Sequence, residues 1–258
     1  MRITAALLVL ASLGLAPAAG ASEIAPADRV SGFDQMQPEI QAMQREDLSN
    51  PGMLAVRAGE ALWTAAAPGG GACASCHGEA SASMRGVAAR YPAFDARAGR
   101  AIDLTGQVNR CRVERQGAHA LATEAADMLA LTAFIGLQSR GQPVAPSDDA
   151  RLAPTRALGE SLYRQRMGQL DLSCSQCHDD NWGRRLGSSL IPQGHANGYP
   201  LYRLEWQSLG SFYRRLRNCM TGVRAEPFPA GSDEAIALEL YLATRGGGLP
   251  VETPAVRP

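Results

Sequence analysis

The 258-residue sequence has few of the features that mark nucleic-acid-binding or membrane-spanning proteins. Its 25 basic and 25 acidic side chains balance, so it lacks the positive excess that binds nucleic acid or anionic membranes. Its longest apolar run, residues 5–15, is too short to cross a bilayer, and no later stretch reaches that length. Aromatic residues make up only 5%, and there are four histidines. We therefore expect neither a membrane span nor nucleic acid as a partner.

The N-terminus carries the three parts of a secretory signal. Arg2 gives a positive start, residues 5–15 form the apolar segment, and Ala19-Gly20-Ala21 supplies the small residues that a signal peptidase accepts. We expect residues 1–21 to be a cleaved signal peptide and the mature protein to be periplasmic. A retained N-terminal anchor is the alternative.

The six cysteines do not divide simply into three disulfides. Four of them belong to two Cys-x-x-Cys-His motifs, at residues 73–77 and 174–178. Two thiols three positions apart can add to the two vinyl groups of one haem, and the following histidine is then held against the iron. A thioredoxin-like pair would need a βαβ context, and a zinc site would need further Cys or His at ligand spacing. The motifs therefore predict two covalently bound haem c groups. Cys73, Cys76, Cys174 and Cys177 would be the attachment sites, with His77 and His178 as iron ligands.

Each motif lies within one copy of a longer repeat. Gly59-Glu60-Ala61-Leu62-Trp63 precedes the first motif, and Gly159-Glu160-Ser161-Leu162-Tyr163 precedes the second. Further on, each copy has a lone cysteine and an amphipathic closing helix, which ends soon before Arg140-Gly141 in one copy and Arg245-Gly246 in the other. No segment alternates as a strand would.

This organisation predicts an all-α chain of two tandem class I cytochrome c-like domains with long loops. The Pro- and Gly-containing segment 141–148 indicates the linker between them. We place the N-terminal domain at residues 22–145, with the first haem, and the C-terminal domain at residues 146–258, with the second.

The lone cysteines are the candidates for the second axial ligand of each iron. Cys111 follows His77 by 34 residues, and Cys219 follows His178 by 41. Corresponding positions in duplicated domains favour corresponding roles. A thiolate ligand stabilises ferric iron, so such haems are poor electron acceptors at ordinary potentials.

Other assignments for these positions stay open. Exported proteins favour disulfides, so Cys111 and Cys219 could be joined to each other. Methionine is the usual ligand of electron carriers, and Met220 could take that role with Cys219 as its neighbour. Met84 has no counterpart in the second copy, and Met128 fits a packing role in the closing helix.

An arginine cluster precedes Cys219 in residues 211–219, which read as a helix. Arg215 lies four positions before Cys219, so both side chains project from one helix face. A guanidinium there would lower the pKa of the thiol and could hold an oxyanion by paired hydrogen bonds. Arg214 and Arg217 fit a solvated basic face, which is also the alternative for Arg215.

The residues after Cys219 resemble a known family. The segment Met220-Thr221-Gly222-Val223-Arg224-Ala225-Glu226-Pro227 is similar to the active-site signature of the SoxA family of bacterial sulfur-oxidising cytochromes. Residues 50–54, leading into the first repeat, are also similar. The resemblance extends from about Ser31 to Arg245.

That resemblance implies a function and partners. Members of the family pair with a monohaem cytochrome c, SoxX, and couple thiosulfate to a cysteine of the carrier SoxY in the SoxYZ complex, passing two electrons to an electron-accepting cytochrome c. By resemblance, Cys219 would be the catalytic iron ligand, often found as a persulfide. Arg215 would bind substrate, and Cys111 would be an axial ligand of the first haem. The rival interpretations are a dihaem electron-transfer cytochrome without sulfur transfer and a dihaem peroxidase.

Overall fold

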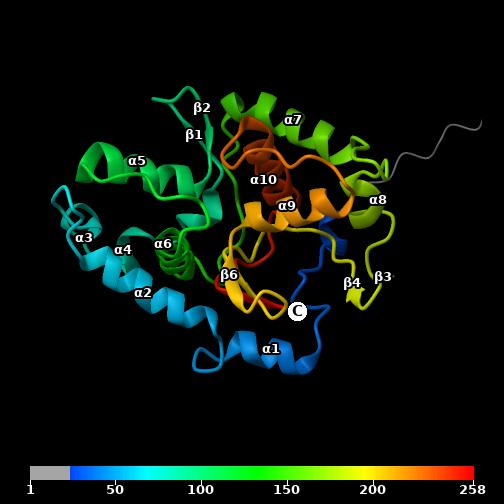
Figure 1. Cartoon of the computed structure of the whole chain (residues 1–258), viewed down its shortest axis with the longest axis horizontal. Helices are drawn as coiled ribbons and strands as arrows, with labels where there is room; N and C mark the ends of the chain where they lie inside the picture. Colours follow the sequence, from blue (N-terminus) through cyan, green and yellow to red (C-terminus); the bar gives the residue numbers. More distant parts are fainter. Residues whose placement is uncertain (1–23) are drawn as a thin grey trace, which may run out of the picture.

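The computed structural model of the chain describes residues 24–258; the expected signal peptide lies outside these residues. Helices dominate, and Figure 1 shows them in two groups. The first half contains η1 Pro26–Asp28, α1 Pro38–Arg45, α2 Gly52–Thr64, α3 Cys73–His77, α4 Ala80–Ser83, η2 Ala88–Arg90, β1 Ala93–Asp95, β2 Arg100–Ile102, α5 Leu104–Gln116 and α6 Ala126–Leu137. The second contains η3 Ala150–Leu152, α7 Ala153–Arg164, α8 Cys174–His178, β3 Arg185–Leu186, β4 Ser189–Leu190, β5 Leu201–Arg203, β6 Ser208–Gly210, α9 Phe212–Gly222, α10 Asp233–Arg245 and β7 Ala255–Arg257.

A crossing of two helices at a glycine forms the centre of each half. A Cβ added at Gly59 of α2 would lie 2.1 Å from the carbonyl oxygen of Ala130 in α6. A Cβ added at Gly159 of α7 would lie 2.0 Å from the carbonyl oxygen of Ala237 in α10. Only glycine allows backbones to approach so closely. The repeat seen in the sequence is therefore a repeat of this helix crossing.

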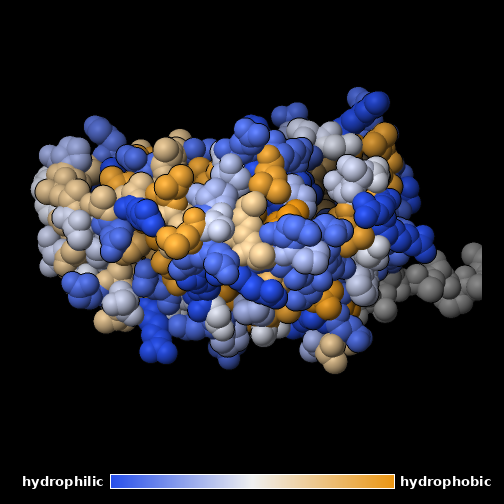
Figure 2. Space-filling model, turned by 90° about the horizontal axis from the view of Figure 1, so that it is seen from below, coloured by the Kyte–Doolittle hydropathy of each residue, from blue (hydrophilic) through white to orange (hydrophobic). Residues whose placement is uncertain are grey.

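Each crossing is packed with apolar side chains around an aromatic pair. The rings of Trp63 and Phe134 lie 5.9 Å apart in the first half, and those of Tyr163 and Tyr241 lie 5.2 Å apart in the second. Both distances lie within the range of favourable tilted ring packing. On the face shown in Figure 2, hydrophilic residues predominate with smaller apolar patches between them.

Short strands supplement the helices. Strands β1 and β2 form an antiparallel hairpin directly before α5, and β5 and β6 form one directly before α9. Strand β7 adds to β5 in parallel. The all-α prediction therefore describes the helical cores but not these connections. Strands of two or three residues are too short to show an alternating pattern.

The N-terminal segment of the described chain lies against the second half. The Val30 amide donates to Gln193 Oε1 at 2.9 Å, and Arg29 Nη1 donates to the Gly247 carbonyl at 2.7 Å. Figure 1 shows this segment, in blue, passing behind the helices of the second half. Between residues 24 and 258, no helix combines the length and apolar character needed to cross a membrane.

Candidate active site

Helix α8 holds the second Cys-x-x-Cys-His motif in a capped turn. The Ser173 hydroxyl accepts from the Gln176 amide at 3.3 Å, and the Gln176 side chain accepts from the Ser173 amide at 2.9 Å. This reciprocal pair satisfies N-terminal donors that the turn cannot satisfy itself. Cys174, Cys177 and His178 are therefore presented by a short rigid element.

The His178 ring is held in one orientation by the segment 192–195. Its Nδ1 is hydrogen-bonded to the Pro192 carbonyl oxygen at 2.7 Å, so Nδ1 carries the proton. Gly194, with φ of +80°, packs against the same ring; a Cβ there would lie 3.0 Å from Cγ and Nδ1 of His178. Metal-binding histidines are commonly fixed in this way, with the other ring nitrogen left for the metal.

Cys219, on α9, faces His178. Burial would raise the pKa of the Cys219 thiol, but a hydrogen bond with the His178 side chain and the charges of Arg215 and Arg203 outweigh it and bring this pKa down to about 7. Such a thiol is substantially ionised near neutral pH. The two residues predicted as axial ligands of the second haem therefore lie together.

Two arginines contribute to the positive field at Cys219. Arg215 is half-buried on the same helix, and no described residue accepts a hydrogen bond from its guanidinium. Arg203, at the end of β5, forms an ion pair with Glu205 at 2.9 Å and has a side chain only 11% exposed. The structure thus supports the prediction that Arg215 shares a face with Cys219. By contrast, Arg214 stacks on Trp206 at 4.3 Å and Arg217 is exposed.

Sequence reasoning missed Arg203 and the Pro192 carbonyl. Arg203 comes from a hairpin whose strands are too short to show an alternating pattern, and an isolated arginine there gives no signal. The Pro192 contribution is a backbone atom, which no residue pattern can indicate. Both depend on how the 180–210 region folds back over α8 and α9.

The first motif has a related but different arrangement. Burial raises the pKa of the Cys73 thiol, and the charge of the nearby Cys111 thiol also raises it. Gln116 Nε2 donates a hydrogen bond to Cys73 Sγ at 3.7 Å. Cys111, on α5, accepts from Gln107 Nε2 at 3.3 Å. The His77 ring lies 5.7 Å from Trp63. Cys111 is therefore brought to its own motif.

The alternatives left open by the sequence receive no support. No disulfide links any two of the six cysteines, so Cys111 is not joined to Cys219. Met220 is 4% exposed and packs in the cluster that contains Tyr163 and Tyr241. Met128 is fully buried, as expected for a packing residue.

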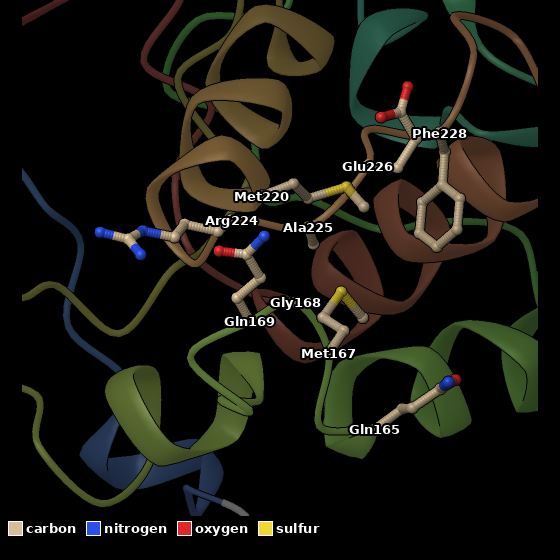
Figure 3. A pocket seen from close by; sticks show the side chains of 9 residues that line it. All are labelled: Gln165, Met167, Gly168, Gln169, Met220, Arg224, Ala225, Glu226 and Phe228. Atoms are coloured by element: carbon tan, nitrogen blue, oxygen red, sulfur yellow. The ribbon is translucent and has the colours of Figure 1, made fainter.

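A cavity of about 450 Å³ lies beside the C-terminal end of α9. Figure 3 shows Met220 extending from α9 at this cavity, with Met167 across from it and Arg224 turned away from both. Cys219 does not line this cavity, so Cys219 and the adjacent Met220 face different parts of the molecule. The lining residues are Gln165, Met167, Gly168, Gln169, Met220, Arg224, Ala225, Glu226 and Phe228.

Both clusters fit haem c. Each offers two thiols and a histidine on one short helix, with a cysteine brought in from a separate helix. In the second cluster, Nδ1 of His178 is engaged by Pro192, so Nε2, the nitrogen toward Cys219, would be the one to hold iron. Within residues 24–258, no set of three or more His, Cys, Asp or Glu side chains converges as a conventional metal site.

Comparisons with known proteins point in one direction. The family described as SoxA/TsdA, cytochrome c domain, matches residues 58–144 and 158–251. The L-cysteine S-thiosulfotransferase subunit SoxA of Pseudaminobacter salicylatoxidans is 41% identical over 253 residues, covering 97% of this chain and 88% of that protein. The same subunit of Rhodovulum sulfidophilum is 39% identical, covering 88% and 79%. The crystal structure of SoxXA from P. pantotrophus matches with a TM-score of 0.85 at 38% identity, covering 88% of this chain and 86% of that chain.

Proposed function

The chain belongs to the SoxA/TsdA cytochrome c family and within it to the SoxA group, and from this premise we propose that it is an L-cysteine S-thiosulfotransferase subunit. As a member of this family it is a c-type cytochrome with covalently bound haem c, and its two motifs provide for two haems. In the proposal it conjugates thiosulfate to a cysteine of a sulfur-carrier protein of the SoxYZ type.

The proposed reaction joins two sulfur atoms and releases two electrons. A carrier thiol and thiosulfate, S₂O₃²⁻, give a carrier S–SSO₃⁻ adduct, one proton and two electrons. The carrier S–H bond breaks, and a bond forms between the carrier sulfur and the outer sulfur of thiosulfate. A haem c held by Cys174, Cys177 and His178 would supply one-electron redox chemistry at this site, and an electron-accepting cytochrome c would take the electrons onward.

The surroundings of Cys219 carry the proposal. A thiol with a pKa of about 7, lowered in part by two arginines, is a nucleophile placed where an anion is attracted. The Cys219 thiolate would first bind the outer sulfur of thiosulfate in a sulfur–sulfur bond, with loss of two electrons. The carrier thiolate would then attack that sulfur and release the Cys219 thiolate.

Arg215 is the proposed substrate-binding residue. Its guanidinium is available for the sulfonate oxygens of thiosulfate because no described residue accepts a hydrogen bond from it. A planar guanidinium offers paired donors that match an oxyanion. Arg203 adds positive charge, but its ion pair with Glu205 makes it a field contributor rather than the direct ligand.

We assign the haem-holding residues by motif and repeat. In the proposal, the first haem is attached and ligated by Cys73, Cys76, His77 and Cys111, and the second by Cys174, Cys177, His178 and Cys219. The two haem-binding units would be tandem class I cytochrome c-like domains at residues 22–145 and 146–258. The repeated glycine crossings support this division.

The proposed assembly is a periplasmic heterodimer with a monohaem cytochrome c. The similarity to the SoxA chain of SoxXA supports a SoxX-like partner. Export rests on the predicted signal peptide.

The electron-shuttle alternative is not favoured. A simple electron shuttle would need an accessible methionine-ligated haem, and Met220 instead packs in the core while Cys219 faces His178. The three relatives at 38–41% identity are all thiosulfotransferase subunits rather than electron carriers.

Reconstitution tests the proposal. Purified complex of this chain with its monohaem partner, thiosulfate, reduced carrier protein and an oxidised cytochrome c should yield a carrier heavier by one thiosulfonate group. Cytochrome c reduction should match it at two electrons per adduct. Cytochrome reduction without adduct formation would instead support the electron-shuttle alternative.

A further inference from the structure

A buried ion pair includes the residue that follows His178, and the proposed sulfur chemistry does not use it. Arg245, the last residue of α10, is 1% exposed and forms an ion pair with Asp179, whose side chain is 2% exposed. Asp179 is the residue immediately after His178. Burying two charges is costly unless they are paired, so this pair calls for an explanation beyond stability alone.

Arg245 joins the two segments that hold the His178 ring. One Nη binds Asp179, at the end of α8, and the other donates to the Gln193 carbonyl at 2.7 Å. Gln193 follows Pro192, whose carbonyl oxygen is hydrogen-bonded to His178 Nδ1. One guanidinium therefore fixes both the helix that carries His178 and the strap, residues 192–195, that orients its ring.

The rest of the strap is locked by its own contacts. The side chain of Gln193 is fully buried and accepts from the Val30 amide at 2.9 Å. The same oxygen is hydrogen-bonded to His195 Nε2 at 2.9 Å. Burial and the charges of Arg245 and Arg29 lower the pKa of His195 to about 3, so His195 is neutral and adds no charge.

Apart from each other, Asp179 and Arg245 have few polar partners among the described residues. The Tyr163 hydroxyl donates to Asp179 Oδ1 at 2.8 Å, and the Arg245 guanidinium lies 5.1 Å from the Tyr163 ring. Asp179 Oδ2 and Arg245 Nε have no hydrogen-bond partner among residues 24–258. Each charge is therefore compensated mainly by the other, and removing one would expose the other to its neighbours.

The first half has no such clamp. The residue after His77 is Gly78, whose carbonyl accepts from the Trp63 indole at 3.0 Å. The closing helix α6 is followed by Arg140, which pairs at 2.7 Å with Asp47 at the surface, the two side chains being 37% and 49% exposed. The same Arg-Gly signal in the sequence thus serves a surface ion pair in one half and a buried one in the other.

We propose that Arg245 and Asp179 are positioning and tuning residues of the second haem unit. Arg245 holds the His178 imidazole in place through Asp179 and Gln193, and the balanced charges set the reduction potential of that haem but not of the first. The inference rests on the proposed role of His178 as an iron ligand.

The test uses the full-length dihaem protein and measures the potential of each haem by redox titration, followed by electron paramagnetic resonance. Asp179→Asn leaves the guanidinium uncompensated, which favours the reduced state. At a fixed potential, the reduced-to-oxidised ratio of the second haem should rise on the order of tenfold, equivalent to 59 mV for a one-electron couple. Adding Arg245→Gln to Asp179→Asn removes both charges and should return the potential toward wild type.

A matched control pair and one further variant make the result decisive. The matched pair Asp47→Asn and Arg140→Gln should leave both haems unchanged. Tyr163→Phe keeps the core ring but removes the donor to the carboxylate; it should shift the second haem slightly toward the oxidised state. If Asp179→Asn protein is not recovered with both haems, the potential of the second haem in Tyr163→Phe tests the proposal instead.

Wild-type spectra distinguish a failure of the proposed ligand assignment from a failure of the inference about the ion pair. If the wild-type second haem lacks histidine–thiolate low-spin signals, the proposed ligand assignment is wrong. If those signals are present and Asp179→Asn or Tyr163→Phe lowers only the Tm, the pair is structural and the inference is overturned.

Discussion

The Cys219 side chain is hydrogen-bonded to His178, although the two residues lie on different helices, α9 and α8. The contact places the low-pKa thiol of Cys219 beside the imidazole of His178, whose Nδ1 is hydrogen-bonded to the Pro192 carbonyl oxygen. Arg215, one helical turn before Cys219, completes a site with a nucleophile, an anion-binding cation and a haem-binding motif. Five predictions follow from this arrangement and from the repeated architecture.

Replacing Cys219 with alanine should abolish thiosulfate conjugation. The change removes the proposed nucleophile and the proposed iron ligand together, so activity should fall to background and the spectrum of the second haem should change. Mass measurement of the carrier after incubation with thiosulfate reports the adduct. Haem staining should still show two haems, because Cys174 and Cys177 remain. Adduct formation at the wild-type rate would disprove a role for this thiol.

Replacing Arg215 with lysine should be damaging although the charge is kept. An ammonium cannot offer the planar paired donors that fit a sulfonate, and losing one charge-assisted contact of about 1.5–3 kcal/mol lowers kcat/KM roughly ten- to a hundredfold. The haem spectrum should stay near wild type. The chain contains no lysine, so peptide mapping identifies the variant at once. Arg217→Lys, on the exposed side of α9, is the matched control; equal effects of the two changes would show that the loss is not specific to Arg215.

Replacing Cys111 with alanine should alter the first haem and spare sulfur transfer. Cys111 lies with Cys73 and Gln107 in the first half, away from Arg215 and Cys219. The electron paramagnetic resonance spectrum should lose one thiolate-ligated signal. The kcat/KM for thiosulfate should stay within about twofold of wild type, a change in activation free energy of less than about 0.6 kcal/mol. Loss of transfer would show that the first haem takes part in turnover.

Replacing Gly159 with alanine should destabilise the second half. The new Cβ would lie 2.0 Å from the Ala237 carbonyl oxygen, so α7 and α10 must move apart at an expected cost of about 3 kcal/mol. The Tm measured by circular dichroism should fall by roughly 5–10 °C. Gly222→Ala, in α9, meets nothing within 4 Å and should change stability by no more than about 1 kcal/mol. A neutral Gly159→Ala would mean that the helices do not cross as closely as described.

Intact mass should count two haems per chain. Cys73, Cys76, Cys174 and Cys177 provide two thioether pairs, one at each motif. The mature protein should also start near Ser22, and extra sulfur on Cys219 would appear in the same spectrum. A single haem per chain would contradict the central assignment.

The sequence alone determined the covalent chemistry and the duplication. Thioether attachment depends on thiols three positions apart and on the next residue, and such local spacing survives any fold. The glycine of each repeat, Gly59 and Gly159, also appeared in the pattern. Its meaning emerged only when each was found against a carbonyl of the closing helix. The position of Arg215 relative to Cys219 was predictable because both lie within two turns of one helix.

Tertiary structure decided what surrounds those motifs. Arg203 and the Pro192 carbonyl reach the site from segments that carry no motif, because a folded chain can bring together groups of any sequence separation. The contrast between Arg140 and Arg245 shows the same limit. Both are followed by glycine after an apolar closing helix, yet one pairs with Asp47 in water and the other with Asp179 in the interior. Burial changes the free energy of a charged side chain far more than the adjacent residues in the sequence do. Only the fold therefore makes Arg245 part of the second haem unit.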